Sequence, residues 1–71
     1  MDLAKLTLMA NQIARNFAVQ GDERAVTATA EHINLFWDPR MKAEIAAAKP
    51  ADLSPIAAAA VNRLVLTGKI A

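Results

Sequence analysis

The feature that most constrains the fold is the pair Asp38-Pro39, because it places a boundary between two helices near the middle of the chain. Proline lacks a backbone N–H and has a fixed φ, so it fits the first turn of a helix and pushes the preceding residue out of helical geometry. Asp38 can accept a hydrogen bond from a free N–H of the new helix. Ser54-Pro55 repeats the pattern. One helix should therefore end near residue 37, and others should begin at 39 and 55.

Apolar residues recur at helical spacing in every segment between these boundaries, and no alternating run calls for a strand. Gly21 and Gly68 are suited to end the first and last helices, because glycine adopts positive φ at little cost. The expected fold class is all-α: a small bundle of about four short helices in one domain, residues 1–71, with an antiparallel hairpin followed by two shorter helices. The expected helices span residues 3–20, 22–37, 39–48 and 55–67.

The helical stripes also predict which side chains form the core. In the first helix they are Leu3, Leu6, Ala10, Ile13 and Phe17. In the second they are Val26, Ala30, Ile33 and Trp37, widened by Thr29 and Phe36. In the third they are Met41, Ile45 and Ala48, with Lys42 and Glu44 facing outward. In the last they are Ile56, Ala57, Ala60, Val61 and Leu64.

The apolar content exceeds what so small a core can bury. Hydrophobic residues make up 55% of a 71-residue chain, and short domains bury the smallest share of their surface. The last helix is apolar nearly all round, interrupted only by Asn62 and Arg63, and three short helices cannot surround it. Leu8, Val19 and Leu35 also lie away from the predicted core. Exposed apolar surface of this kind indicates a protein partner, or self-association of the isolated chain.

The residue types needed for chemistry are scarce. The chain has no cysteine, one histidine and two glycines, so it lacks cysteine ligands for metals or clusters and has no glycine-rich phosphate loop. His32 is better placed to stack on Phe36, four residues on, than to act as a catalyst. We therefore expect no catalytic, cofactor-binding or metal-ligating residue.

Charge and hydropathy argue against nucleic acid and membrane partners. The net charge is +1 and the basic residues are scattered, which argues against nucleic acid binding. No apolar run is long enough to cross a membrane, and the N-terminus lacks a signal-peptide pattern. The absence of cysteine fits a reducing cytoplasm, where we expect the protein to act.

The candidate partner surface combines three features. Trp, Met and Arg are enriched at interface centres and converge at the predicted helix junction. Two successive amides interrupt the apolar first helix, and apolar residues remain on the outer side of the last. The candidate interface residues are Asn11, Gln12, Phe36, Trp37, Arg40, Met41, Val65 and Leu66.

Three motifs carry a resemblance to a known family. They are Met9-Ala10-Asn11-Gln12-Ile13-Ala14, then His32-Ile33-x-x-Phe36-Trp37-Asp38-Pro39-Arg40-Met41, then Leu53-Ser54-Pro55. In this order they resemble the small delta subunit of the NAD-dependent, molybdenum- or tungsten-containing formate dehydrogenases. The likeness runs from about Leu3 to the region of Leu64, and the block around Trp37 is its most specific part.

The resemblance implies a noncatalytic accessory subunit of an oxidoreductase complex. Its partner would be the large catalytic subunit, which it would bind and stabilise or help mature. The molybdenum or tungsten pterin, iron–sulfur clusters, FMN and the NAD site would lie in other subunits. Two other classes remain open: a small helical DNA-binding regulator, and a homo-oligomeric helical module, including an enzyme with a site built between protomers.

Overall fold

The helix boundaries follow the chemistry of the capping residues. The computed structural model describes residues 2–70, and within that range it contains helices and no strand. The elements are α1 (Leu3–Phe17), a 3₁₀ turn η1 (Ala18–Gln20), α2 (Asp22–Phe36), α3 (Pro39–Ala48) and α4 (Pro55–Leu66). The predicted all-α class with four helices is confirmed. Residues 1 and 71 of the expected domain lie outside the described range.

Side-chain caps start three of the helices. Asp2 Oδ1 accepts from the Ala4 N–H at 3.2 Å, Asp38 Oδ1 accepts from the Met41 N–H at 2.9 Å, and Ser54 Oγ accepts from the Ala57 N–H at 3.3 Å. Each cap satisfies a backbone donor that the helix itself leaves free. The predicted junctions at residues 38 and 54 are therefore confirmed.

Two glycines end helical segments with positive φ. Gly21 has φ 95° and separates the first two helices, while Gly68 has φ 75° and follows the last. The segment predicted as the end of the first helix, Ala18–Gln20, is a 3₁₀ turn, which tightens the chain before the reversal. Beyond Gly68 the chain folds back, and the N–H groups of Lys69 and Ile70 donate to the Leu64 carbonyl. Ile70 thereby joins the core.

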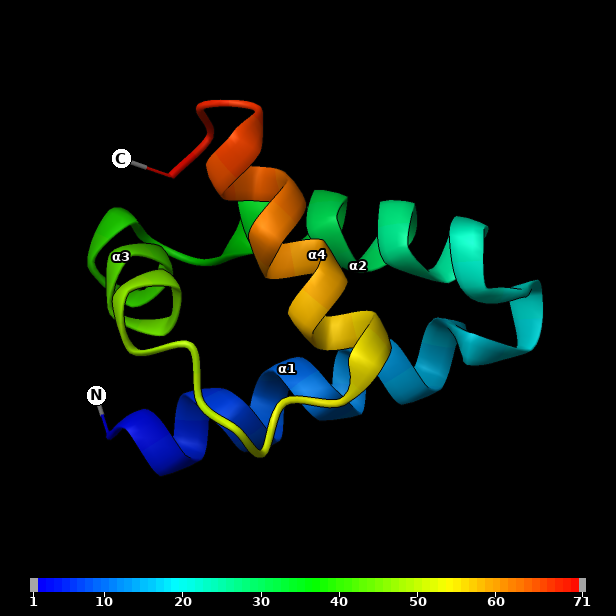
Figure 1. Cartoon of the computed structure of the whole chain (residues 1–71), viewed down its shortest axis with the longest axis horizontal. Helices are drawn as coiled ribbons and strands as arrows, with labels where there is room; N and C mark the ends of the chain where they lie inside the picture. Colours follow the sequence, from blue (N-terminus) through cyan, green and yellow to red (C-terminus); the bar gives the residue numbers. More distant parts are fainter. Residues whose placement is uncertain (1, 71) are drawn as a thin grey trace.

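The first two helices form a hairpin, and the last helix lies across it. α1 and α2 run antiparallel, and α4 crosses them steeply (Figure 1). α3 packs at one end, against α1 and α4. The link from α3 to α4 runs past α1 before α4 begins (Figure 1). None of the helices within residues 2–70 has the length and apolar character needed to cross a membrane.

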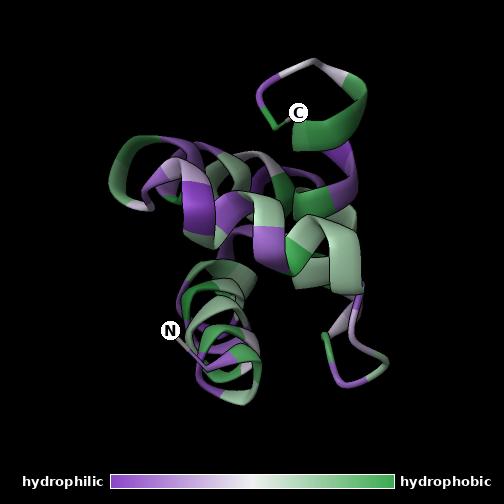
Figure 2. Ribbon diagram, turned by 90° about the vertical axis from the view of Figure 1, so that its left-hand side faces the viewer, coloured by the Kyte–Doolittle hydropathy of each residue, from purple (hydrophilic) through white to green (hydrophobic). Residues whose placement is uncertain are grey.

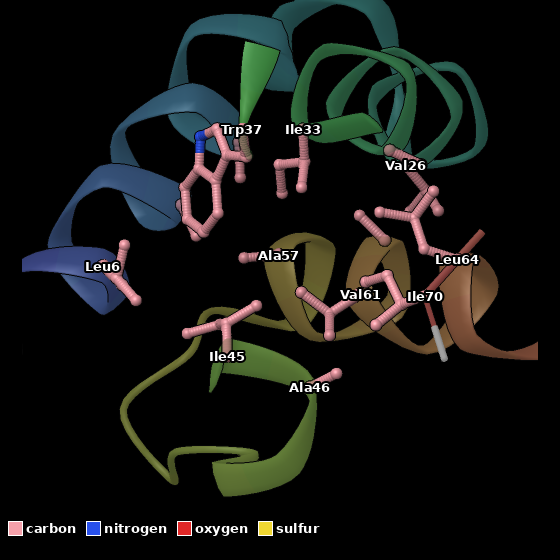
Figure 3. Close-up of a cluster of buried hydrophobic side chains, with 14 residues drawn as sticks. Leu6, Val26, Ile33, Trp37, Ile45, Ala46, Ala57, Val61, Leu64 and Ile70 are labelled. Carbon is pink, nitrogen blue, oxygen red and sulfur yellow. The ribbon is translucent and has the colours of Figure 1, made fainter. Parts of the chain in front are cut away.

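The core is built from aliphatic side chains around one tryptophan (Figure 3). Trp37 retains only 5% exposure and lies beside Ile33, with its indole nitrogen pointing away from the cluster. Small residues let α4 approach the hairpin closely. Four alanines from α1 and α4 are at most 2% exposed: Ala10, Ala14, Ala57 and Ala60.

Three predictions about helix faces were wrong. Phe36 is 71% exposed, because its ring stacks on His32 at the groove surface instead of entering the buried cluster. Ala48 is exposed, and Ala46 is buried in its place. Lys42 is half-buried rather than outward-facing, since its ammonium donates to the carbonyl and side-chain oxygens of Asn34 at 3.4 Å. A cation there also complements the C-terminal dipole of α2.

Polar contacts also join α2 to α4. The Arg63 guanidinium donates to Thr27 Oγ1 at 2.6 Å, so one of the two polar residues of α4 ties it to α2. Thr29, one turn further along α2 than Ala25, is fully buried and its hydroxyl has no hydrogen-bond partner within the described residues. An unsatisfied buried hydroxyl destabilises the folded state.

Replacing Thr29 should therefore stabilise the protein. Thr29→Val keeps the shape and removes the unpaired hydroxyl, so we expect the free energy of unfolding to rise by about 1 kcal/mol. Thr27→Val is the matched control, because it makes the same change but removes the Arg63 contact. Urea denaturation of both variants tests this, and a stability loss in Thr29→Val would contradict it.

Truncation of Trp37 should lower the stability of the protein much more than truncation of its neighbour Phe36. Trp37→Ala removes the largest core side chain and should cost about 3–5 kcal/mol of stability. Phe36→Ala changes an exposed residue and should shift stability by less than about 1 kcal/mol. Thermal and urea unfolding followed by circular dichroism compares them. Equal losses would mean that Phe36 also packs in the core.

Candidate protein-interaction surface

A shallow groove of about 410 Å³ lies where α1, α2 and α3 meet. Helix α1 contributes one wall, and the end of α2 with the start of α3 contributes the other. Its lining is mainly apolar and aromatic, with two amides and one imidazole. The lining residues are Met9, Gln12, Ile13, Asn16, His32, Phe36, Trp37 and Met41.

The groove brings together two motifs that are far apart in the sequence. Residues 9–13 supply Met9, Gln12 and Ile13 from α1, and residues 36–41 supply Phe36 and Met41 with the edge of the core tryptophan. Both are parts of the blocks that resemble the formate dehydrogenase delta subunit. Parts of two of the three motifs therefore form one continuous surface.

An aromatic row extends the groove wall. The rings of His32 and Phe36 lie 4.7 Å apart at 43°, which confirms the predicted stacking. Phe17 approaches the same imidazole edge-on at 6.4 Å. The sequence analysis did not anticipate this second contact, because it joins different helices. Aromatic pairs prefer particular ring orientations and contribute stabilisation in addition to that of the area they bury.

The structure separates the predicted interface residues into groups. Gln12, Phe36 and Met41 line the groove, and Phe36 is its most exposed aromatic at 71%. Arg40 is exposed beside Met41 at the start of α3. Trp37 also borders the groove, but it is 5% exposed and therefore belongs to the core.

Sequence reasoning missed four lining residues. Met9 and Asn16 were not singled out, and Ile13 was predicted only as a core residue, although with Gln12 they follow the spacing of one helix face. His32 was interpreted only as a partner of Phe36. The spacing was a usable signal, but the groove itself depends on how α1 packs against α2 and α3.

Asn11 lies on the other side of α1 and binds within the chain. Its Nδ2 donates to the Asp52 carbonyl at 2.9 Å, and its Oδ1 accepts from the Ser54 N–H at 2.8 Å. One side-chain amide thus holds two backbone groups, two residues apart, in the link between α3 and α4. Asn11 fixes the approach of α4, which accounts for its amide without a partner protein.

The outer face of α4 is a second apolar surface. Val65 is 36% and Leu66 77% exposed, and Ala58 and Ala59 are exposed on the same helix. Figure 2 shows the α4 ribbon mostly in the hydrophobic colour, broken by polar residues. A groove of about 380 Å³ runs along this helix, lined partly by Leu53, Ala58 and Val65. The prediction that the other helices leave part of α4 uncovered is confirmed.

The titratable side chains that the structure describes form no cluster suited to a metal ion. Among residues 2–70, no group of three or more His, Cys, Asp or Glu side chains is placed to hold a metal ion. His32 is the sole ionisable side chain in the groove lining. The residues gathered there are suited to contact apolar groups and to form amide hydrogen bonds.

A small helical chain with two uncovered apolar surfaces is typical of a subunit of a larger protein assembly. The family comparison makes this specific. The chain belongs to the family described as NADH-dependent formate dehydrogenase delta subunit FdsD, whose model matches residues 5–61. It is thus a member of a subunit family of an oxidoreductase complex, as the motifs predicted. No curated protein and no solved structure shows a significant match.

The family match covers the two surfaces unequally. It includes every residue that lines the groove between α1 and α3, and it ends at Val61, before Val65 and Leu66. The groove is therefore the surface that falls wholly inside the matched region.

Loss of the Asn11 amide should destabilise the chain itself. Asn11→Ala leaves the Asp52 carbonyl and the Ser54 N–H without their partner, and we expect a loss of about 1–3 kcal/mol in urea unfolding. Gln12→Ala, an exposed amide one position along, should stay within about 0.5 kcal/mol. Equal stability of the two variants would show that the Asn11 contacts do not hold the link.

Proposed function

We propose that the chain is a noncatalytic accessory subunit that binds the large catalytic subunit of an NAD-dependent formate dehydrogenase. The observation that carries this proposal is the groove, in which parts of two of the motifs form one largely apolar and aromatic surface inside the region that the family model matches. Phe36 presents a large apolar ring there and is 71% exposed. Covering this ring with a partner protein would remove apolar surface from water, which favours binding. Binding would stabilise the catalytic subunit or assist its maturation in the cytoplasm.

Arg40, the residue before Met41 in the sequence, supports partner binding near this groove although it does not line it. It lies in the first turn of α3, where a cation is unfavourable for the helix dipole. Its exposed guanidinium is free to pair with a carboxylate of a partner, and bidentate pairs of this kind are strong and specific. Arginine is also among the residues that dominate binding energy at interfaces.

The proposal assigns the redox chemistry to other subunits. The sequence contains no cysteine to ligate an iron–sulfur cluster and no glycine-rich loop for a dinucleotide or flavin phosphate. The pterin metal centre, clusters, FMN and NAD would accordingly belong to the larger chains. This subunit would act through contact alone, and its exposed apolar residues would favour self-association when it is isolated.

Binding to the purified catalytic subunit tests the proposal. The parent chain should bind, and Arg40→Ala should weaken binding by about 2 kcal/mol or more while helicity is unchanged. Phe36→Ser should weaken it comparably. Leu8→Ser is the control, because Leu8 is 66% exposed but lies outside the groove lining. Biolayer interferometry gives the dissociation constants, and circular dichroism checks the fold.

Leu66→Ser distinguishes the two apolar surfaces. If it weakens binding while Phe36→Ser and Arg40→Ala do not, the catalytic subunit binds α4 rather than the groove. If the parent chain does not bind the catalytic subunit at all, the proposed function is wrong. A pull-down from the native cell, read by mass spectrometry, would then identify the subunit that it does contact.

A further inference from the structure

We propose that the outer face of α4 joins two copies of this chain in an antiparallel helix pair, with a two-fold axis at Asn62. The proposal goes beyond the accessory function above, because it concerns another surface and another partner. Three observations carry it: the position of the face between two grooves, the order of its side chains, and an amide at its centre.

The outer face of α4 forms a ridge with a groove on each side. Successive helix residues are rotated by about 100°, so five exposed residues lie within an arc of about 120°, mainly opposite the buried face. These residues are Ala58, Ala59, Asn62, Val65 and Leu66. The groove described above, lined by Ala58 and Val65, borders the ridge on the side of the α3–α4 link. A second groove of about 380 Å³, lined by Ala59 and Leu66, borders it on the side of α2.

The side chains of the ridge are arranged symmetrically about Asn62. Two alanines precede it by four and three residues, and Val65 and Leu66 follow it by three and four. In an antiparallel pair with a two-fold axis at Asn62, positions before the axis in one copy face positions after it in the other. Ala58 then faces Val65 of the second copy, and Ala59 faces Leu66.

This order makes the ridge complementary to itself. Each alanine leaves space that the larger side chain opposite can fill, and facing small and large residues lets packed helices interdigitate. A parallel pair would instead place alanine against alanine at one end and Leu66 against Leu66 at the other, which leaves a void and a crowded contact. A two-fold interface requires a self-complementary patch, so the pattern favours a second copy in the antiparallel orientation.

Asn62 supplies a polar contact at the centre of the pair. It is exposed in the middle of an otherwise apolar ridge. An amide has donors and an acceptor, so two amides that meet at a two-fold axis can form reciprocal hydrogen bonds. A single asparagine in an apolar helix interface also fixes its register. The charged neighbour Arg63 is directed away from the axis, because its guanidinium donates to Thr27 of the same chain at 2.6 Å.

The area of the ridge indicates a weak, reversible dimer. A standard protein interface buries about 800 Å² from each partner, which is about a fifth of the 4521 Å² surface of this chain. Five side chains, two of them alanines, supply less than this. The groove proposed for the catalytic subunit stays accessible in such a dimer, because among residues 2–70 its lining shares no residue with either groove beside α4.

Charged substitutions on the ridge test the proposal. The parent chain should show a monomer–dimer equilibrium in sedimentation velocity. Leu66→Lys and Ala59→Glu should each raise the dimer dissociation constant about tenfold or more, because each places an unpaired charge in an apolar contact. Leu35→Lys is the matched control, since Leu35 is 74% exposed against 77% for Leu66 but lines neither groove beside α4. Circular dichroism checks that each variant keeps its helicity.

A mixture of the two ridge variants tests the orientation. In an antiparallel pair with one copy of each, the carboxylate introduced by Ala59→Glu faces the ammonium introduced by Leu66→Lys, and the other half of the interface keeps its native contact. The mixture should therefore form dimers at concentrations where neither variant does so alone. A parallel pair would leave the two charges about 10 Å apart along the helix and would not recover.

Three results would overturn the proposal: a parent chain that stays monomeric at about 1 mM, a loss of dimer in Leu35→Lys equal to that in Leu66→Lys, or no recovery in the mixture. If the parent chain is monomeric and Leu66→Lys instead weakens binding to the purified catalytic subunit, that subunit covers the ridge. The proposed function is tested separately, because Phe36→Ser changes the groove between α1 and α3 and should leave the dimer intact.

Discussion

The burial of Trp37 is the interaction on which the rest of the structure depends. Asp38 and Pro39 start α3 so abruptly that Trp37 adopts an extended backbone at the end of α2, with φ −90° and ψ 139°. This geometry directs the indole of Trp37 into the core, and the residue is only 5% exposed. Phe36, the last residue of α2, remains 71% exposed. The same corner brings Met41 to the groove. One junction thus anchors the core and shapes the surface.

Much of the fold could be predicted from the sequence because its boundaries are local. Asp38, Ser54 and the prolines that follow them act on the adjacent residues, so their effect does not depend on tertiary packing. The all-α class, the hairpin and the uncovered face of α4 follow from periodicity and from the size of the chain. The stacking of His32 on Phe36 was also predictable, since residues four apart on a helix are neighbours.

The remainder depends on how distant elements meet. The periodicity of α2 includes Phe36 in the apolar stripe, but its ring lies at the groove lined by α1, α2 and α3, outside the core. Asn11 appeared available for a partner, although its amide holds Asp52 and Ser54, more than forty residues away in sequence. Ile70 reaches the core through a chain reversal after Gly68. The candidate groove likewise arises from three helices, so no single segment could indicate it.

The alanines of α4 give this helix an uneven tolerance to evolutionary change. Ala57 and Ala60 are fully buried where α4 crosses the hairpin, whereas Ala58 and Ala59 between them are exposed. A larger side chain at either buried position would push the helices apart, and overpacking of this kind is destabilising. At the exposed pair the fold itself leaves room for larger side chains. Of these four adjacent alanines, the two buried ones set how closely α4 packs on the hairpin, and the other two form exposed surface.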